Sequence, residues 1–206
     1  MSYFASAVPE SERLRTTVQS GGGAAVSLME AYEHLRLDTL NEEDANVSNL
    51  LQAATRAMEN KTGWALSQKT YAGKLDRLPR VRNGRREVRL PHPPANIITS
   101  ITYIDADDQT QTMSTDLYTL DNASVPGRVI FDTAVGDLTF ADEANVITIT
   151  YTAGYASGDV PADLRAAVLL MVGHWFENPE ASTARRVTLL PLGVESLLSE
   201  YQLPRV

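Results

Sequence analysis

The amino-acid sequence predicts an α+β fold: two flanking helix pairs form a helical core, and an antiparallel β block is inserted between them. Apolar residues recur at helical spacing in residues 27–63 and again in residues 159–200. Between these segments, residues 64–158 show short β-branched runs separated by turn residues. The chain has 206 residues, of which 43% are hydrophobic and 21% charged, so it is long enough to bury a sizeable core.

Composition excludes several classes of protein. No stretch approaches the roughly 18 uninterrupted apolar residues that a transmembrane helix needs, and the first residues do not resemble a secretory signal. The chain contains no cysteine, which excludes disulfides, thiolate metal sites and cysteine nucleophiles. We therefore expect a protein that folds in a reducing cytoplasm, has no membrane contact, and is stabilised by packing alone.

Residues 1–26 are expected to form a flexible N-terminal arm. They contain Pro9 and the run Gly21-Gly22-Gly23, and they show no sustained periodicity. The glycine run does not match a phosphate-binding loop, because no Lys-Ser/Thr pair follows it.

Two helices are predicted after the arm. Ser27 and Glu30 fit a capping box, and an apolar face follows at helical spacing from Leu28 to Leu35. A second capping box at Thr39-Leu40-Asn41-Glu42 opens a longer helix that Gly63 is placed to end. The short connection between the two helices predicts an antiparallel hairpin.

The central segment predicts an antiparallel sheet or a small sandwich. Its strands are expected near residues 97–104, 117–120, 128–131 and 146–151, with turn chemistry at Asp105-Ala106-Asp107-Asp108 and Pro126-Gly127. A further helix is expected to start at Pro161 and stop at Asn178-Pro179, before a last short helix near residues 194–201. The simplest packing brings the two helix pairs together and leaves the β block as an insertion.

The sequence offers no catalytic, cofactor or metal site. The three histidines, His34, His92 and His174, have no ligand spacing, and no nucleophile elbow occurs. Asp105, Asp107 and Asp108 resemble the start of a calcium loop, but the glycine and the closing glutamate are missing, so a hairpin turn is the favoured interpretation. We therefore expect no cofactor and a protein that is not an enzyme.

Charge is distributed unevenly along the chain. The net charge is −8, yet seven of the 18 basic residues lie between Lys74 and Arg89, with only Asp76 and Glu87 among them. Three interpretations stay open: a solvated hairpin around Asn83-Gly84, a docking surface for an acidic protein face, and a phosphate-binding segment. The candidate contact residues for a neighbouring subunit or partner are Arg77, Arg80, Arg82, Arg85, Arg86, Arg185 and Arg186.

An ordered set of short phrases resembles one known family. The phrases include Glu59-Asn60-Lys61-Thr62-Gly63-Trp64, Arg89-Leu90-Pro91, Ile101-Thr102-Tyr103-Ile104-Asp105, Pro126-Gly127-Arg128-Val129, Ile149-Thr150-Tyr151-Thr152-Ala153-Gly154-Tyr155, Val172-Gly173-His174-Trp175-Phe176-Glu177-Asn178 and Leu190-Pro191-Leu192-Gly193-Val194. Over roughly residues 28–201, the chain resembles the head–tail connector, or adaptor, proteins of tailed bacteriophages and gene transfer agents.

The resemblance implies a non-enzymatic ring of identical subunits, usually twelve, at the virion neck. Such a ring is assembled in the bacterial host cytoplasm, sits below the portal protein, extends the DNA channel without specific DNA binding, and receives a downstream stopper or tail-completion protein. It also implies a C-terminal docking tail for the portal, expected here at Tyr201, Gln202, Leu203, Pro204, Arg205 and Val206. The alternatives are a ligand- or carbohydrate-binding β module with a helical clasp and, with less support, a hydrolase using Asp105 or Asp108.

Overall fold

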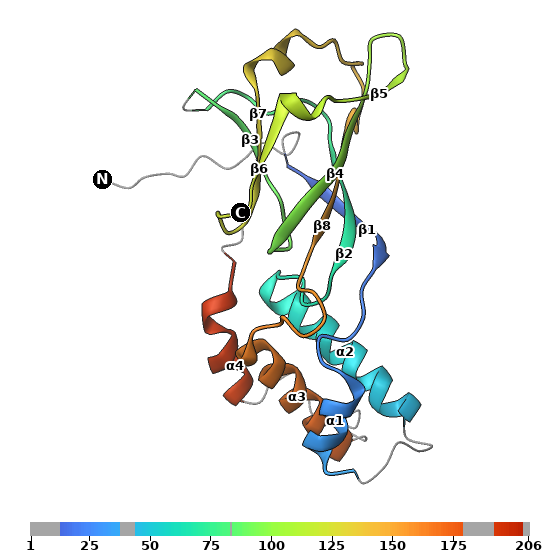
Figure 1. The fold of residues 1–206 in the computed structure, drawn as a ribbon, viewed down its shortest axis with the longest axis vertical. Helices are drawn as coiled ribbons and strands as arrows, with labels where there is room; N and C mark the ends of the chain where they lie inside the picture. The colour runs from blue at the N-terminus through green and yellow to red at the C-terminus, as the bar shows by residue number, and fades with distance from the viewer. Residues whose placement is uncertain (1–12, 38–43, 83, 179–191, 204–206) are drawn as a thin grey trace, which may run out of the picture. The chain divides into compact units, whose positions relative to one another are not determined.

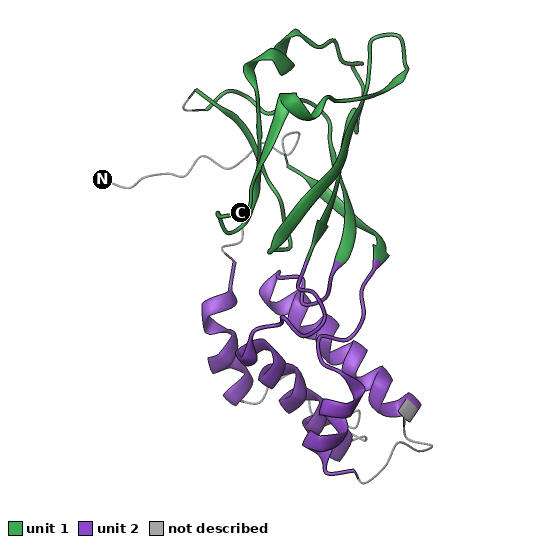
Figure 2. Cartoon of the chain, in the orientation of Figure 1, with its two compact units in different colours: residues 1–20, 69–153, 204–206 green, residues 21–68, 154–203 purple. Residues whose placement is uncertain are grey.

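The computed structural model describes residues 13–37, 44–82, 84–178 and 192–203 (Figure 1). The chain divides into two compact units, which are coloured separately in Figure 2. The β unit comprises residues 1–20, 69–153 and 204–206, and the helical unit comprises residues 21–68 and 154–203. The predicted α+β class, with strands inserted between helical segments, is confirmed.

The helical unit contains four α-helices within the described residues. They are α1 (Leu28–Leu35), α2 (Asp44–Thr62), α3 (Ala162–Glu177) and α4 (Leu192–Leu198), and the 3-10 helix η4 (Ser199–Tyr201) follows α4. The predicted cap of α1 is present: the Ser27 hydroxyl accepts the Glu30 N–H, and the Glu30 carboxylate accepts the Ser27 N–H at 3.0 Å. Gly63 ends α2 with φ +79°, a left-handed conformation that favours glycine. The predicted second capping box, residues 39–42, lies outside the described residues.

One core joins the two helix pairs. Helix α3 packs against α2, α4 and α1, as the sequence predicts. The fully buried side chains that meet there include Val47, Ala54, Met58, Leu164, Ala167, Val168, Val172, Val194 and Leu198. Helix α3 begins one residue after the position expected from Pro161, which serves as its N-cap, and it ends at Asn178 as predicted.

The β unit contains two sheets. The five-stranded sheet has the order β1 (Arg15–Gly21), β2 (Lys69–Leu75), β8 (Ile147–Ala153), β4 (Ala95–Ile104) and β5 (Thr110–Thr112). The three-stranded sheet has the order β3 (Arg86–Arg89), β7 (Arg128–Phe131) and β6 (Tyr118–Asp121). The short 3-10 helices η2 (Thr115–Leu117) and η3 (Thr133–Asp137) flank β6 and β7. The strands pair in antiparallel fashion in β2–β8, β4–β8, β4–β5, β3–β7 and β6–β7.

Strand β8 is the centre of the larger sheet, and its residues alternate between buried and half-buried. Tyr151 on this strand is fully buried, stacks on Tyr71 of β2 at 5.5 Å, and donates its hydroxyl to the Pro91 carbonyl at 2.9 Å. Burial strongly raises the pKa of the Tyr151 hydroxyl, because the ionised form would lose its hydration. The strongest predicted strand therefore forms the core of the β unit.

Three strands, β1, β2 and β5, are not among those that the sequence predicted. The expectation that no folded element precedes Ser27 is wrong for residues 15–21, which form β1 at the edge of the larger sheet. The Leu14 side chain contacts Gly73 of β2 closely. A Cβ on residue 73 would be only 2.7 Å from the Leu14 side chain. Arg15 pairs with Asp76, and these contacts hold β1 against β2. Strand β5 was not predicted, because its sequence Thr-Gln-Thr carries no apolar signal.

Candidate interaction surfaces

The predicted basic hairpin is present between β2 and β3. Arg82 and Arg85 exchange two backbone hydrogen bonds, of 2.8 and 3.0 Å, across a two-residue turn. Gly84 in this turn has φ +76°, which a type I′ hairpin turn requires and which glycine adopts without strain. Asn83, the other turn residue, lies outside the described residues. The sequence signal for this turn was therefore correct, although β2 and β3 belong to different sheets.

Arg86 connects the hairpin to the body of the β unit. Its guanidinium Nη1 donates a hydrogen bond to the Pro79 carbonyl at 2.9 Å, and this bond ties the loop before the hairpin to β3. Beside it lies a cavity of about 330 Å³, lined by Val81, Arg85, Arg86, Phe131, Asp132 and Thr133. Val81 is 56% exposed and Phe131 is buried, so the hairpin presents an apolar side chain next to a partly polar hollow.

The acidic neighbours of the basic segment are engaged by other arginines. Glu87 and Asp121 both bind Arg128, at 3.0 and 2.8 Å, across the three-stranded sheet. Asp76 accepts hydrogen bonds from Arg15 and from the Asn145 N–H, and these bonds lower the pKa of its carboxyl group. The hairpin itself exposes Arg80, Arg82 and Arg85. The two carboxylates within the basic segment, Asp76 and Glu87, are thus paired with arginines outside it.

The predicted contact arginines are not all gathered on one described surface. Arg77, Arg80, Arg82 and Arg85 lie in the loop between β2 and β3, and Arg86 is the first residue of β3. Arg185 and Arg186 lie outside the described residues, so their relation to this loop stays a prediction.

The predicted docking tail begins on a fixed part of the helical unit. Tyr201 meets the Trp64 ring edge-on, with ring centroids 5.3 Å apart. The Leu203 N–H donates to the Thr62 carbonyl at 3.5 Å, and its side chain lies against Gly63. Pro204, Arg205 and Val206 lie outside the described residues. Tyr201 and Leu203 therefore contact their own chain, a role that sequence reasoning missed because the contacts span some 140 residues.

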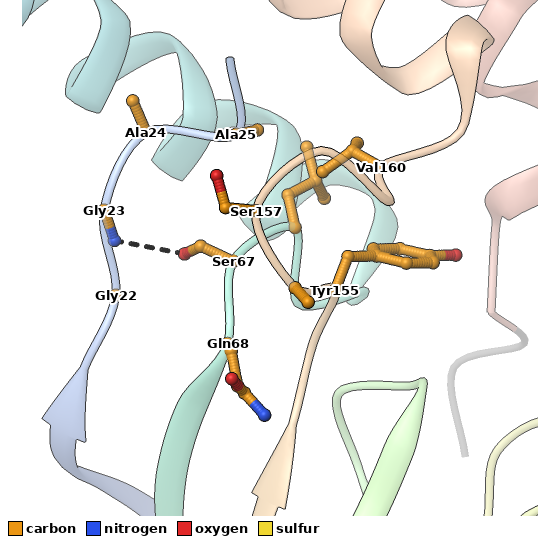
Figure 3. Close-up of a pocket in the computed structure, with 11 residues that line it drawn as sticks. Gly22, Gly23, Ala24, Ala25, Ser67, Gln68, Tyr155, Ser157 and Val160 are labelled. Atoms are coloured by element: carbon orange, nitrogen blue, oxygen red, sulfur yellow. Dashed lines mark hydrogen bonds between the residues drawn. The ribbon is translucent and has the colours of Figure 1, made fainter. Parts of the chain in front are cut away.

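A small hollow of about 230 Å³ lies in the helical unit (Figure 3). Residues 22–25, 66–68, 155–157 and 160 line it, and the Gly23 N–H donates to the Ser67 hydroxyl at 3.3 Å. In Figure 3 the Tyr155 ring points away from the Gly22–Gly23 backbone. Burial, with a smaller effect of Tyr201, raises the pKa of Tyr155 to about 12. The lining therefore offers hydroxyl and backbone groups, and no charged side chain belongs to it.

The remaining candidates for chemistry have structural roles. Asp105 accepts the N–H groups of Asp107 and Gln109 and the side-chain amide of Gln111, which closes the β4–β5 hairpin as the favoured interpretation predicts. His92 stacks on Tyr71 at 4.6 Å, and its Nε2 lies 3.1 Å from the Thr16 hydroxyl. Within the described ranges, no group of three or more potential metal ligands converges. The helices described here include none that is both long and apolar enough to cross a bilayer.

Comparison with known proteins gives a consistent result. Residues 26–187 match the head completion protein family. Three solved structures are similar: the neck of an empty gene transfer agent (GTA) particle computed with C6 symmetry, the virion of a native GTA particle, and the neck of a native GTA particle computed with C12 symmetry. Their TM-scores are 0.72, 0.71 and 0.68, with identities of 24%, 26% and 23%.

Each similarity extends over nearly the whole of both chains. The matches cover 93%, 93% and 94% of this chain and 97%, 96% and 96% of the neck or virion chains. No curated protein matches the sequence. The family match spans α1, α2, the strands β2 to β8 and α3, and it confirms the resemblance to head–tail connector proteins. The chain belongs to the head completion protein family.

Proposed function

We propose that this chain is a neck protein of a tailed-phage-like particle, where identical copies form a ring, with twelve as the expected number. The observation that carries the proposal is the similarity in fold, over 94% of this chain, to a chain of a GTA neck computed with C12 symmetry. The family match to head completion proteins supports the same role.

A ring requires two different faces on each subunit, because each copy contacts its neighbours in a head-to-tail manner. The uneven charge of this chain offers such faces. The helical unit carries 13 acidic and 6 basic residues, a net charge of −7, whereas residues 74–89 of the β unit carry a net charge of +5. An acidic channel wall would also repel DNA phosphates and allow the genome to pass without being bound.

The proposed partners are the portal protein above the ring and a stopper or tail-completion protein below it. The C-terminal residues 201–206 are the proposed portal contact. Since Tyr201 and Leu203 are anchored on Trp64 and Gly63, the tail would leave the helical unit from a defined point. An extended segment that docks into a partner is a common mode of peptide recognition.

The role is proposed to be non-enzymatic. The two hollows described above lack the combination of nucleophile, base and orienting group that catalysis requires. The competing role of a carbohydrate-binding β module draws no support from Tyr71 and Tyr151, because both rings are buried in the β unit rather than exposed for stacking on a sugar.

Reconstitution with the portal tests this function. The purified chain is mixed with the portal protein of the same phage and imaged by negative-stain electron microscopy. A collar of this chain on one end of the portal is the expected result. A chain that stays monomeric in the presence of portal, at concentrations well above those of assembly, would contradict the proposal.

A further inference from the structure

The β unit presents two charged features of opposite sign. The basic hairpin comprises residues 80–86 and exposes Arg80, Arg82 and Arg85 beside Val81. We define the acidic corner as the turn that carries Asp107 and Asp108 together with the loop that carries Asp142 and Glu143, and all four of these side chains are exposed.

Backbone hydrogen bonds assemble the acidic corner from two distant segments. The Ala141 N–H donates to the Ile104 carbonyl at 3.0 Å, and the Ile104 N–H donates to the Val146 carbonyl at 2.9 Å. Phe140 and Tyr103 pack with ring centroids 5.1 Å apart and support the same junction. The loop 141–146 is therefore fixed beside the β4–β5 hairpin, and its two carboxylates join those of the turn.

The acidic corner has little local compensation. Between residues 90 and 153, Arg128 is the only lysine or arginine in the sequence, and its guanidinium is bound by Asp121 and Glu87. The nearest described ion pair, Arg15 with Asp76, reaches this loop at Asn145, and its two charges neutralise each other. Lys74, which lies opposite Thr148, and Arg77, which acts on Asp76, are the basic residues toward this end of the sheet. The four carboxylates of the corner outnumber these two cations.

The two features lie on opposite sides of the β unit. Figure 1 shows the loop between β2 and β3 on the left of this unit, and β5 with its turn on the upper right. A head-to-tail ring requires complementary patches on opposite sides of each subunit, whereas a two-fold dimer would require one self-complementary patch. The placement of these charges thus fits a closed ring.

We infer that the acidic corner of one copy docks on the basic hairpin of the next copy, and that this contact joins the β units around the ring. The inference rests on the proposed function. The occupant of the cavity beside Val81 and Arg85 is accordingly a carboxylate-rich loop of a second copy. Several ion pairs at the rim of each contact set the register of neighbouring subunits, and the exposed Val81 is covered as they close.

Cysteine cross-linking tests the inference directly, because the natural chain contains no cysteine. Arg82→Cys and Asp107→Cys are introduced together in one chain and also separately, and rings formed with portal are oxidised. A head-to-tail contact between hairpin and corner predicts a ladder of oligomers from the double variant. Each single variant should give no species larger than a dimer. Rings that assemble normally while the double variant yields no ladder would overturn the inference.

Charge reversal supplies a second, independent measurement. Arg82→Glu with Arg85→Glu cancels the net positive charge of the hairpin, and Asp107→Lys with Glu143→Lys cancels the net negative charge of the corner. Each variant alone should therefore need about tenfold more protein to form rings. An equimolar mixture should restore assembly, since the two variants can alternate around a ring. The matched control, Arg56→Glu with Glu33→Lys, reverses two exposed charges in the helical unit, keeps the net charge of that unit, and should leave assembly unchanged.

The outcomes separate this inference from the proposed function. If wild-type rings form on portal and both reversal variants assemble as well as the wild type, the named contact is wrong and the ring proposal stands. If the wild-type chain forms no ring on portal, the proposed function fails and the inference fails with it. Circular dichroism of each variant confirms folding before assembly is compared.

Discussion

At the scale of single residues, Gly154 occupies a backbone position that leaves no room for a Cβ. Its φ is +103°, and a Cβ there would overlap the Ser67 carbonyl oxygen. Gly23 lines the hollow of Figure 3, and a Cβ on Gly23 would meet nothing within 4 Å. The two glycines thus differ in the room that the structure leaves for a side chain.

Gly154→Ala should destabilise the fold, because the alanine would require both a strained φ and a displacement of the Ser67 backbone. The strained backbone alone costs roughly 1–3 kcal/mol, and the overlap adds to it. Urea unfolding monitored by tryptophan fluorescence gives the free energy of unfolding. Gly23→Ala is the control and should be neutral or slightly stabilising. Equal free energies of unfolding for the two variants would contradict the close approach of Gly154 to the Ser67 backbone.

Asp76 determines how the β1 edge responds to acid. Hydrogen bonds from Arg15 and from the Asn145 N–H lower the pKa of the folded carboxyl below its ordinary value of 3.8. A depressed folded pKa contributes stability above the unfolded pKa, and this contribution is lost as the pH falls through the folded pKa. We expect Asp76→Asn to weaken the protection of β1 amides against hydrogen exchange at neutral pH. The difference from the wild type should shrink below pH 3.8, and a difference that grows with acid would contradict this assignment.

At the scale of elements, the helices follow local signals. Ser27 with Glu30, Gly63, Pro161 and Asn178 mark helix ends in the sequence, and the structure places caps at each of them, with an offset of one residue at Pro161. These signals act within one turn of a helix, so the sequence alone reveals them.

Ser27→Ala tests the first of these caps. Loss of the hydroxyl leaves the Glu30 N–H without its cap, and we expect a loss of about 1 kcal/mol in the free energy of unfolding. Ser48→Ala, within α2, is the control and should be neutral or slightly stabilising, because alanine has the higher helix propensity. Thermal and urea unfolding of both variants measure the effect. A Ser27→Ala variant as stable as the wild type would show that the cap does not contribute.

Strands depend more on distant partners than helices do. Strand β1 reads Arg-Thr-Thr-Val-Gln-Ser-Gly and nearly all of it is exposed, so it has no apolar alternation for a sequence pattern to detect. It exists as a strand because Leu14 lies on Gly73 and Arg15 reaches Asp76. In contrast, β8 is β-branched and alternates regularly, and it was predicted directly. A turn depends on local residues, so the sequence predicted the turn at Asn83-Gly84. The sheet that each flanking strand joins depends on distant partners, so the sequence could not show it.

At the scale of the whole molecule, the interaction surfaces could be predicted only in part. The basic segment is visible in composition, and the structure adds that Glu87 and Asp76 are engaged by Arg128 and Arg15. The acidic corner is not visible in composition, because its carboxylates come from two segments some 35 residues apart. Backbone pairing at Ile104 and the packing of Phe140 on Tyr103 bring these segments together. Contacts between subunits are a property of the assembly, and neither local periodicity nor charge counts can establish them.

The C-terminal tail also acts at this scale. Removal of residues 203–206 should weaken attachment to portal at least tenfold and leave the fold of the helical unit intact, because Leu203 is not among the buried core residues. Removal of Pro204–Val206 alone keeps the Leu203 contact and separates tail docking from tail anchoring. Co-sedimentation with portal measures attachment, and circular dichroism checks the fold. Unchanged attachment after the longer truncation would show that the tail is not part of the portal contact.

The most direct test of the central claim is a cryo-electron microscopy reconstruction of the neck of the assembled particle. The account predicts a closed ring of this chain between portal and tail, with each copy turned by the same angle from the last and its acidic corner against the next basic hairpin. A neck in which this chain is absent, or present as a single copy or an isolated two-fold dimer, would contradict it.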